Sequence, residues 1–114
     1  MLSANQRIVE CIQELIDERY EDCDLNVTWI AEELGKTAKH ISEVYKEETG
    51  EGLLHAINHK RITKAMALMK TGQYKLSELP ELTGYSNMNT FRRNFQNIAG
   101  ISPSKFMENK ARQQ

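Results

Sequence analysis

The chain has 114 residues, of which 39% are hydrophobic and 27% are charged, with two prolines and six glycines. This composition fits one compact soluble domain and excludes a disordered tail and a collagen-like or low-complexity chain. No run of apolar residues approaches the roughly 20 that cross a bilayer, so we expect no membrane contact and a cytoplasmic location. Cys11 and Cys23 have neither disulfide-framework nor zinc-ligand spacing and are expected to remain reduced thiols.

The formal net charge of −1 hides a difference between the two halves of the chain. Residues 1–54 hold five Lys and Arg against thirteen Asp and Glu, a net −8, whereas residues 55–114 hold ten against three, a net +7. A basic half indicates contact with an acidic partner such as nucleic acid, although a charged helix face is more often only solvated.

Apolar residues at helical spacing predict three helices in the first half of the chain. The first runs roughly from Asn5 to Tyr20. Asn26 is a good N-cap for a short second helix, which Gly35 ends. Thr37 caps a third helix that ends near Gly50.

The second half begins with the longest predicted element, a helix from Leu53 to Lys70 of about 18 residues and ~27 Å. A short helix and Gly84 follow, and Ser86 is expected to cap the next helix, which ends at Gly100. Ser102-Pro103 then places serine at the N-cap and proline at the first position of a final helix.

Pro80 falls within the short helix of the second half, where an interior proline would cost about 3 kcal/mol. The cost is avoided if Ser77 is the N-cap, because Pro80 is then the third helical residue, whose N–H position has no intrahelical partner. We therefore expect this helix to start at or after Leu76 and to be short.

The two halves repeat one arrangement of short helix, glycine-containing turn and longer helix. Gly35 and Gly84 lie 49 positions apart, and Gly50 and Gly100 lie 50 apart. This is the arrangement of a helix-turn-helix, and two of them at a fixed offset are much less common than one ordinary helical hairpin. The pattern predicts a single all-α domain over residues 1–114, with about seven helices. Two helix-turn-helix subdomains, 5–51 and 75–108, are joined by one long linker helix, 53–71.

Short motifs stand at fixed positions within this repeat: Ile30-Ala31-x-x-Leu34-Gly35, Gly50, Arg61-Ile62-x-x-Ala65-x-x-Leu68-Met69, Gly84-Tyr85-Ser86, Phe91-x-Arg93-x-Phe95 and Gly100-Ile101-Ser102-Pro103-x-x-Phe106. Together they resemble the DNA-binding domain of the AraC/XylS family of bacterial transcription regulators. The resemblance covers about Gln6 to Glu108, and the motifs of the second half are the more specific.

The resemblance implies sequence-specific binding of double-stranded DNA, with one reading helix of each subdomain in successive major-groove segments about 34 Å apart. It implies a regulator and not an enzyme. RNA polymerase and a sensing or dimerising domain outside this sequence are further partners that the resemblance allows.

The second reading helix is amphipathic. A projection of residues 87–98 places Phe91, Phe95 and Ile98 on one side and Asn89, Arg93 and Gln96 on the other, with Arg92 flanking. Arginine can bond guanine, and asparagine or glutamine can bond adenine, in the major groove. By resemblance the base contacts are Met88, Asn89, Arg92 and Arg93, and the alternative is a solvated face. Met88 can touch a thymine methyl or pack inward.

The first reading helix is less suited to DNA. Residues 38–47 place Ile41, Val44 and Tyr45 inward and Lys39, Glu43 and Lys46 outward, with Ser42 at the margin. The base-contact candidates are Lys39, Ser42 and Glu43. Glu43 can accept a hydrogen bond from a cytosine amino group, or it can form an ion pair with Lys39 or Lys46, which would leave this face unable to read bases. His40 lies away from the lysines and is not expected to read bases.

Phosphate contacts are expected at helix N-termini, where free backbone N–H groups and the helix dipole favour an anion. The candidates, on both subdomains, are Lys36, Thr37, Lys46, Ser86, Asn87, Gln96, Ser102 and Lys105.

Other functions have less support. His55 and His59 have the i, i+4 spacing of a shared metal, but no acidic or thiol third ligand stands nearby in the sequence. The sequence has no Gly-rich phosphate loop, no G-x-S-x-G and no nucleophile, base and acid set, so we expect neither an enzyme nor a cofactor. The alternative function is a helical protein-interaction module that binds a basic or apolar partner through the acidic half, favoured by Glu43, Pro80 and the net −8.

Overall fold

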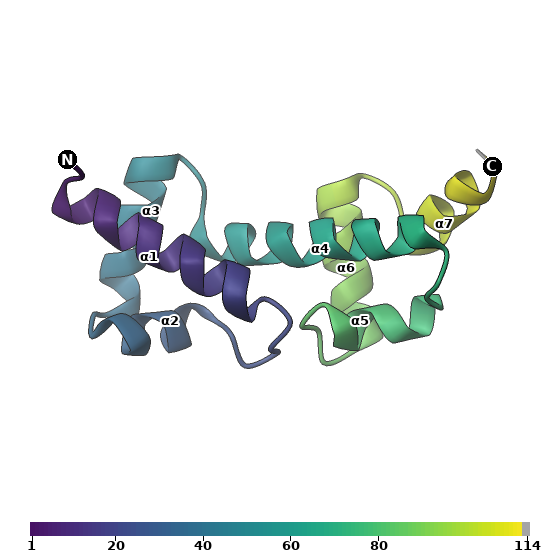
Figure 1. The fold of residues 1–114 in the computed structure, drawn as a ribbon, viewed down its shortest axis with the longest axis horizontal. Coiled ribbons are helices and arrows are strands. Elements are labelled where there is room, and N and C mark those ends of the chain that lie inside the picture. The colour runs from purple at the N-terminus through teal and green to yellow at the C-terminus, as the bar shows by residue number, and fades with distance from the viewer. Residues whose placement is uncertain (113–114) are drawn as a thin grey trace. The chain divides into compact units, whose positions relative to one another are not determined.

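The computed structural model describes residues 1–112, and within this range the chain forms seven α-helices and one 3-10 helix, with no strand. The all-α fold was predicted correctly. Two compact units divide it: Met1–Tyr20 with Asp24–Lys60, and Glu21–Cys23 with the described residues from Arg61 onward. Figure 1 colours the chain from purple at its N-terminus through teal and green to yellow at its C-terminus, so the first unit runs from purple into teal.

The first unit contains α1 (Ala4–Arg19), α2 (Val27–Leu34), α3 (Ala38–Thr49) and the beginning of α4 (Leu53–Thr71). The helix α1 begins one residue earlier than predicted, because Ser3 and Gln6 form a capping box. The backbone N–H of Gln6 donates to Ser3 Oγ at 3.1 Å, and that of Ser3 donates to Gln6 Oε1 at 2.9 Å.

Local capping sets the bounds of α2 and α3 as the sequence predicted. The backbone N–H of Trp29 donates to Asn26 Oδ1 at 2.8 Å, and that of His40 donates to Thr37 Oγ1 at 3.1 Å. Gly35 ends α2 with φ +66°, a left-handed conformation that side chains with a Cβ rarely adopt.

A compact apolar core holds these helices together. Its fully buried side chains come from all four elements and include Ile12, Ile30, Ile41 and Ile57. Each such burial contributes about 1.5–3 kcal/mol relative to an exposed side chain. At the edge of the core Lys60 of α4 donates to Asp17 of α1 at 2.9 Å.

The second unit contains the rest of α4, the 3-10 helix η1 (Leu76–Glu78), α5 (Leu79–Leu82), α6 (Met88–Ala99) and α7 (Pro103–Arg112). A row of aromatic rings runs through its core. Ring centroids are 5.7 Å apart for Tyr85 and Phe91, 5.8 Å for Phe91 and Phe95, and 5.6 Å for Phe95 and Phe106. These edge and tilted arrangements stabilise beyond the area that they bury.

The region around Pro80 differs in part from the prediction. The helical segment starts at Leu76 as expected, but Ser77 is not its N-cap. The N-cap is Lys75, whose backbone N–H donates to the Glu78 carboxylate at 2.9 Å, and the backbone N–H of Glu78 donates to the Lys75 carbonyl at 3.0 Å, which closes one 3-10 turn before α5 begins. Pro80 is then in the first turn of α5, where its missing N–H has no intrahelical role.

None of the helices in the described part of the chain combines the length and the apolar character needed to cross a membrane.

Candidate nucleic-acid interface

The helix α6 starts at a cap that the sequence placed one residue too early. Asn87, not Ser86, is the N-cap, with extended backbone (φ −151°, ψ 158°) and an Oδ1 that accepts from the backbone N–H of Thr90 at 2.8 Å. Both residue types cap helices well, so local preference does not separate them; the turn after α5 leaves Asn87 in the cap conformation. Ser86 is exposed immediately before it.

The two faces of α6 differ completely. Phe91 and Phe95 are 0% exposed, whereas the opposite side presents exposed polar and cationic groups: Asn89, Arg92, Arg93 and Gln96. The sequence of α6 contains no acidic residue. This exposed face therefore has positive charge together with amides that can both donate and accept, which is the composition that suits base edges.

Met88 stands apart from the other three base-contact candidates of α6. It is half-buried and packs against the core of the second unit. The side chains of Asn89, Arg92 and Arg93 remain exposed.

The N-terminus of α7 is built as expected. The backbone N–H of Lys105 donates to Ser102 Oγ at 3.1 Å, and that of Phe106 donates to the Ser102 carbonyl at 3.0 Å. Pro103 is buried at the first position of the helix, where proline fits. The Lys105 side chain is exposed next to this helix end.

The helix α3 of the first unit presents a mixed face. Ile41, Val44 and Tyr45 are buried, and burial raises the pKa of the Tyr45 phenol. Lys39, Glu43 and Lys46 are exposed and Ser42 is half-buried, so the predicted inward and outward sides of α3 are correct.

Glu43 is not neutralised by its neighbours on α3. Neither Lys39 nor Lys46 forms an ion pair with it among the described side chains. Lys46 instead donates from Nζ to the Gly50 carbonyl at 3.2 Å. Lys36, Thr37 and His40 are also exposed, all near the start of this helix.

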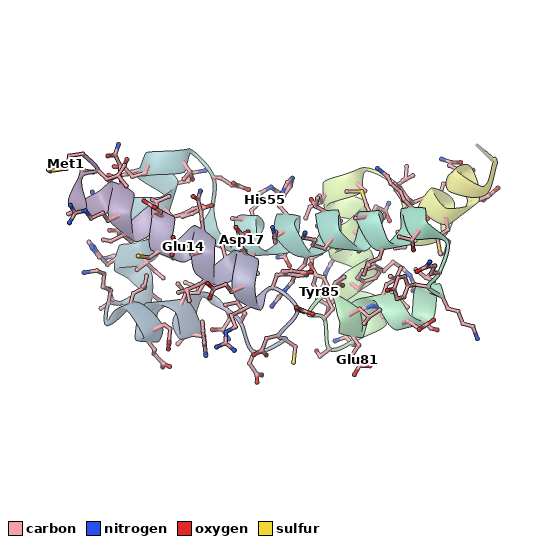
Figure 2. The ribbon with its side chains drawn as sticks, in the orientation of Figure 1. Met1, Glu14, Asp17, His55, Glu81 and Tyr85 are labelled. Carbon is pink, nitrogen blue, oxygen red and sulfur yellow. The ribbon has the colours of Figure 1, made fainter. Side chains whose placement is uncertain are left out.

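An open pocket of about 590 Å³ lies at the N-terminal end of α6. Its lining combines the Glu21–Cys23 segment with residues of η1 and α5 and the start of α6: Ser77, Pro80, Glu81, Tyr85, Ser86, Asn87 and Met88. Figure 2 marks two of them, Tyr85 and Glu81. Two acidic residues of the loop after α1, Glu21 and Asp22, therefore line the same pocket as Met88, the first residue of α6.

One buried charge near this pocket was missed by sequence reasoning. Arg61 of α4 is only 7% exposed, and its Nη2 donates to the carbonyl of Asp22 at 2.9 Å. A signal existed, because Arg61 occupies a place in the row of apolar positions that includes Ile57 and Ala65. Its partner is 39 residues away, and no local pattern identifies it.

The histidine pair of α4 has an acidic neighbour that the sequence analysis did not expect. The ring centroids of His55 and His59 are 6.0 Å apart, and His55 Nε2 lies 3.5 Å from Glu51 Oε1. Glu51 stands one helical turn before His55, so the i, i+4 rule brings them together. Both histidines are exposed and Glu51, which precedes α4, is half-buried. Figure 2 labels His55 near the start of α4.

Comparison with known proteins supports the same functional class. A family model described as a helix-turn-helix domain matches residues 30–109. The HTH-type transcriptional activator Btr of Bacillus subtilis is 36% identical over 76 residues, which are 67% of this chain and 14% of that protein. The HTH-type transcriptional regulator YijO of Escherichia coli is 28% identical over 104 residues, 91% of this chain and 36% of that protein.

A solved structure shows the same fold. The C-terminal domain of AraT, a response regulator from Geobacillus stearothermophilus, superposes with a TM-score of 0.87 at 25% identity, covering 94% of this chain and 88% of that one. The chain thus spans a small part of the two regulators above, 14% and 36%, but nearly all of this domain. It belongs to the AraC-type helix-turn-helix family of DNA-binding transcription regulators, which are not enzymes.

Proposed function

We propose that the chain is a sequence-specific reader of double-stranded DNA that uses two recognition helices, α3 and α6, in successive major-groove segments. In this proposal residues 1–114 act as one DNA-binding domain, with subdomains 5–51 and 75–108 on either side of the linker helix 53–71. The observation that carries it is the exposed face of α6, which has two arginines and no acidic residue opposite a fully buried aromatic face.

Within α6, Arg92, Arg93 and Asn89 read base edges. A guanidinium can donate twice to guanine O6 and N7, and an asparagine amide can match adenine N6 and N7. Met88 contributes at most a contact with a thymine methyl, since part of its side chain already packs inward.

Phosphates are held by groups at the starts of α6 and α7, the exposed Ser86, Asn87 and Lys105 and the half-buried Ser102, with the exposed Gln96 further along α6. The first helix-turn-helix binds in the same way through Lys36, Thr37 and Lys46. Its base readers are Lys39, Ser42 and Glu43, with the Glu43 carboxylate accepting from a cytosine amino group.

Two substitutions separate reading from positioning. Arg93→Ala should cost about 1–3 kcal/mol of DNA-binding free energy and relax the preference at one base pair, because one bidentate contact is lost. Lys105→Ala should weaken all duplexes alike and reduce the slope of log K against log[salt] by about 1. Fluorescence-anisotropy titrations of a cognate and a scrambled duplex at several salt concentrations measure both.

Arg7→Ala is the matched control, because it removes an exposed arginine from α1 and leaves both reading helices unchanged. Equal loss of affinity for cognate and scrambled duplexes in Arg93→Ala would remove Arg93 from the base readers.

The second candidate function is a helical protein-interaction module that keeps the fold without binding DNA. Its support is the outward face of α3, where two lysines stand beside two acidic residues, Glu43 and Glu47. If no duplex binds with an affinity that falls steeply with salt, this alternative replaces the first.

The match covers only 14% and 36% of the two relatives, so those regulators contain further segments beside the matched domain. We propose that the domain works in the cytoplasm next to a sensing or dimerising domain, and that RNA polymerase is a further partner. Co-purification of a longer natural form with polymerase on promoter DNA tests the last point.

A further inference from the structure

We infer that Arg61 is a positioning residue for the reading helix α6: its buried guanidinium holds the Tyr85 turn and the Glu21–Cys23 loop together and thereby sets where α6 begins. This inference rests on the proposed function only for its consequence on DNA, because the contacts lie entirely within the second unit.

The first step is the burial of the charge. Arg61 is only 7% exposed, and a guanidinium remains charged at neutral pH even though burial lowers its pKa. A buried charge is tolerated only when hydrogen bonds and nearby electron-rich groups replace the lost water.

The second step is the set of groups that surround it. Arg61 Nη2 donates to the Asp22 carbonyl at 2.9 Å, and the guanidinium carbon lies 5.5 Å from the centroid of the Tyr85 ring. One side chain of α4 therefore contacts two segments that are far apart in the sequence, the loop after α1 and the turn before α6. A cation over an aromatic face in a dry site is stabilising.

The third step connects Tyr85 to α6. Tyr85 is 5% exposed, its backbone N–H donates to the Pro80 carbonyl at 2.8 Å, and its ring meets Phe91 of α6 edge-on at 5.7 Å. It stands two residues before the N-cap Asn87. The Tyr85 ring is thus packed between the Arg61 guanidinium and the buried face of α6.

The functional consequence concerns the first turn of α6. Asn89, a proposed base reader, lies in that turn, and the exposed carboxylates of Glu21 and Asp22 line the pocket at the same helix end. A small displacement of the turn would misalign donors that must meet base edges within hydrogen-bond distance, whereas diffuse attraction to phosphates would survive it. Arg61 should therefore control discrimination between sequences more than overall affinity.

The experiment compares the wild type with Arg61→Met, Arg61→Lys and Tyr85→Leu, and uses Lys70→Met as the control. Methionine keeps an unbranched apolar stem and removes the donors, and lysine keeps the charge. Lys70 is an exposed cation of the same helix, α4. The first readout needs no DNA: amide hydrogen exchange followed by NMR, at a temperature where each variant gives a folded circular-dichroism spectrum.

In Arg61→Met the amides of Thr90 and Phe91, which bond to Asn87, should exchange about tenfold faster, while those of α1 stay within about twofold of the wild type. Arg61→Lys should recover part of the protection, and Lys70→Met should match the wild type. Tyr85→Leu keeps the Arg61 bond to Asp22 and should lose protection at the same two amides. If Arg61→Met does not fold, this variant still tests whether the contact between Arg61 and Tyr85 positions α6.

The second readout is the ratio of affinities for cognate and scrambled duplexes, which should fall about tenfold in Arg61→Met with little change in scrambled-duplex affinity. Unchanged exchange at Thr90 and Phe91, or an equal loss across α1 and α6, would overturn the positioning role. If the wild type binds no duplex, the proposed function fails, and the exchange data still decide the role of Arg61.

Discussion

The phenol of Tyr85 makes the stability of the second unit depend on pH in the alkaline range. Burial raises the pKa of its phenol from 10.0 to about 12, because the phenolate would lose its water, and the nearby Arg61 charge opposes this only in part. Since an unfolded tyrosine ionises near its ordinary pKa, protons bind the folded state more tightly at this site.

The stability that this group contributes is therefore fully present below pH 10 and is lost as the pH rises from about 10 to about 12. Urea unfolding followed by circular dichroism across this range should show the free energy of unfolding falling with pH. The fall should be shallower in Tyr85→Phe, with the part due to Tyr45, whose pKa is also raised, remaining.

Tyr74→Phe is the matched control, because it removes a hydroxyl from a half-buried tyrosine packed on the same core. Parallel curves for the wild type and Tyr85→Phe would show that Tyr85 ionises equally easily in both states.

At the scale of elements, α3 and α6, the two helices proposed to read DNA, have similar ends and differ in charge. Both begin at a side-chain cap, Thr37 for α3 and Asn87 for α6, and both end at a glycine with positive φ. The exposed side of α6 carries only positive charge, whereas that of α3 mixes lysines with the Glu43 carboxylate, which forms no ion pair among the described side chains. A stronger electrostatic contribution to DNA binding is therefore expected from α6.

The cap of α6 gives a stability prediction that needs no DNA. Asn87→Ala should lower the free energy of unfolding by about 1 kcal/mol, because the backbone N–H of Thr90 loses its acceptor. Asn97→Ala makes the same substitution at an exposed position within α6 and should be neutral or slightly stabilising, since alanine is the better helix former. Urea denaturation of both variants measures the difference, and equal stability would contradict the capping role.

At the scale of the whole molecule, acidic and basic residues are separated along the chain. The net −8 of residues 1–54 and the net +7 of residues 55–114 almost cancel, so total charge conceals a basic second half. Attraction to a phosphate backbone acts within about a Debye length, so this local distribution matters more than the sum.

Selection of bound duplexes from a random library tests the proposal of two readers. The selected sequences should contain two preferred blocks separated by about one turn of DNA, roughly 10 base pairs, with the block read by α6 the more restricted. Insertion of about five base pairs between the blocks should reduce affinity, because it turns one block away from its reader. A single block would leave α6 as the only reading helix.

Several features followed from the sequence because their causes are local. Asn26 and Thr37 as caps, Gly35 as a helix end and the inward rows of α3 and α6 depend on residues within one or two turns of each other. The motifs of the second half, with Gly84 and Ser102-Pro103 at their spacing, were enough to predict the family.

The exact N-cap residues of two helical segments depended on the backbone geometry of the preceding turn. Ser86 and Asn87 are both competent caps, and the turn after α5 selected Asn87. Ser77 has the better capping side chain, but the helical segment begins two residues earlier with Lys75 as its N-cap, where the Glu78 carboxylate accepts from the Lys75 backbone N–H. N-cap preferences rank residue types at one position. They do not decide which of two neighbouring residues with similar preferences becomes the cap.

Local sequence signals were enough to predict the helices, most of their caps to within one residue and the DNA-binding class, because hydrophobic periodicity and helix-end signals act over a few residues. Only the tertiary structure decided that Arg61 is buried against Asp22 and Tyr85, and that Met88 turns partly inward. Such contacts join segments 24 to 39 residues apart. A buried guanidinium must be hydrogen-bonded, and its acceptors come from segments that only the packed fold brings close. No local sequence pattern identifies those segments.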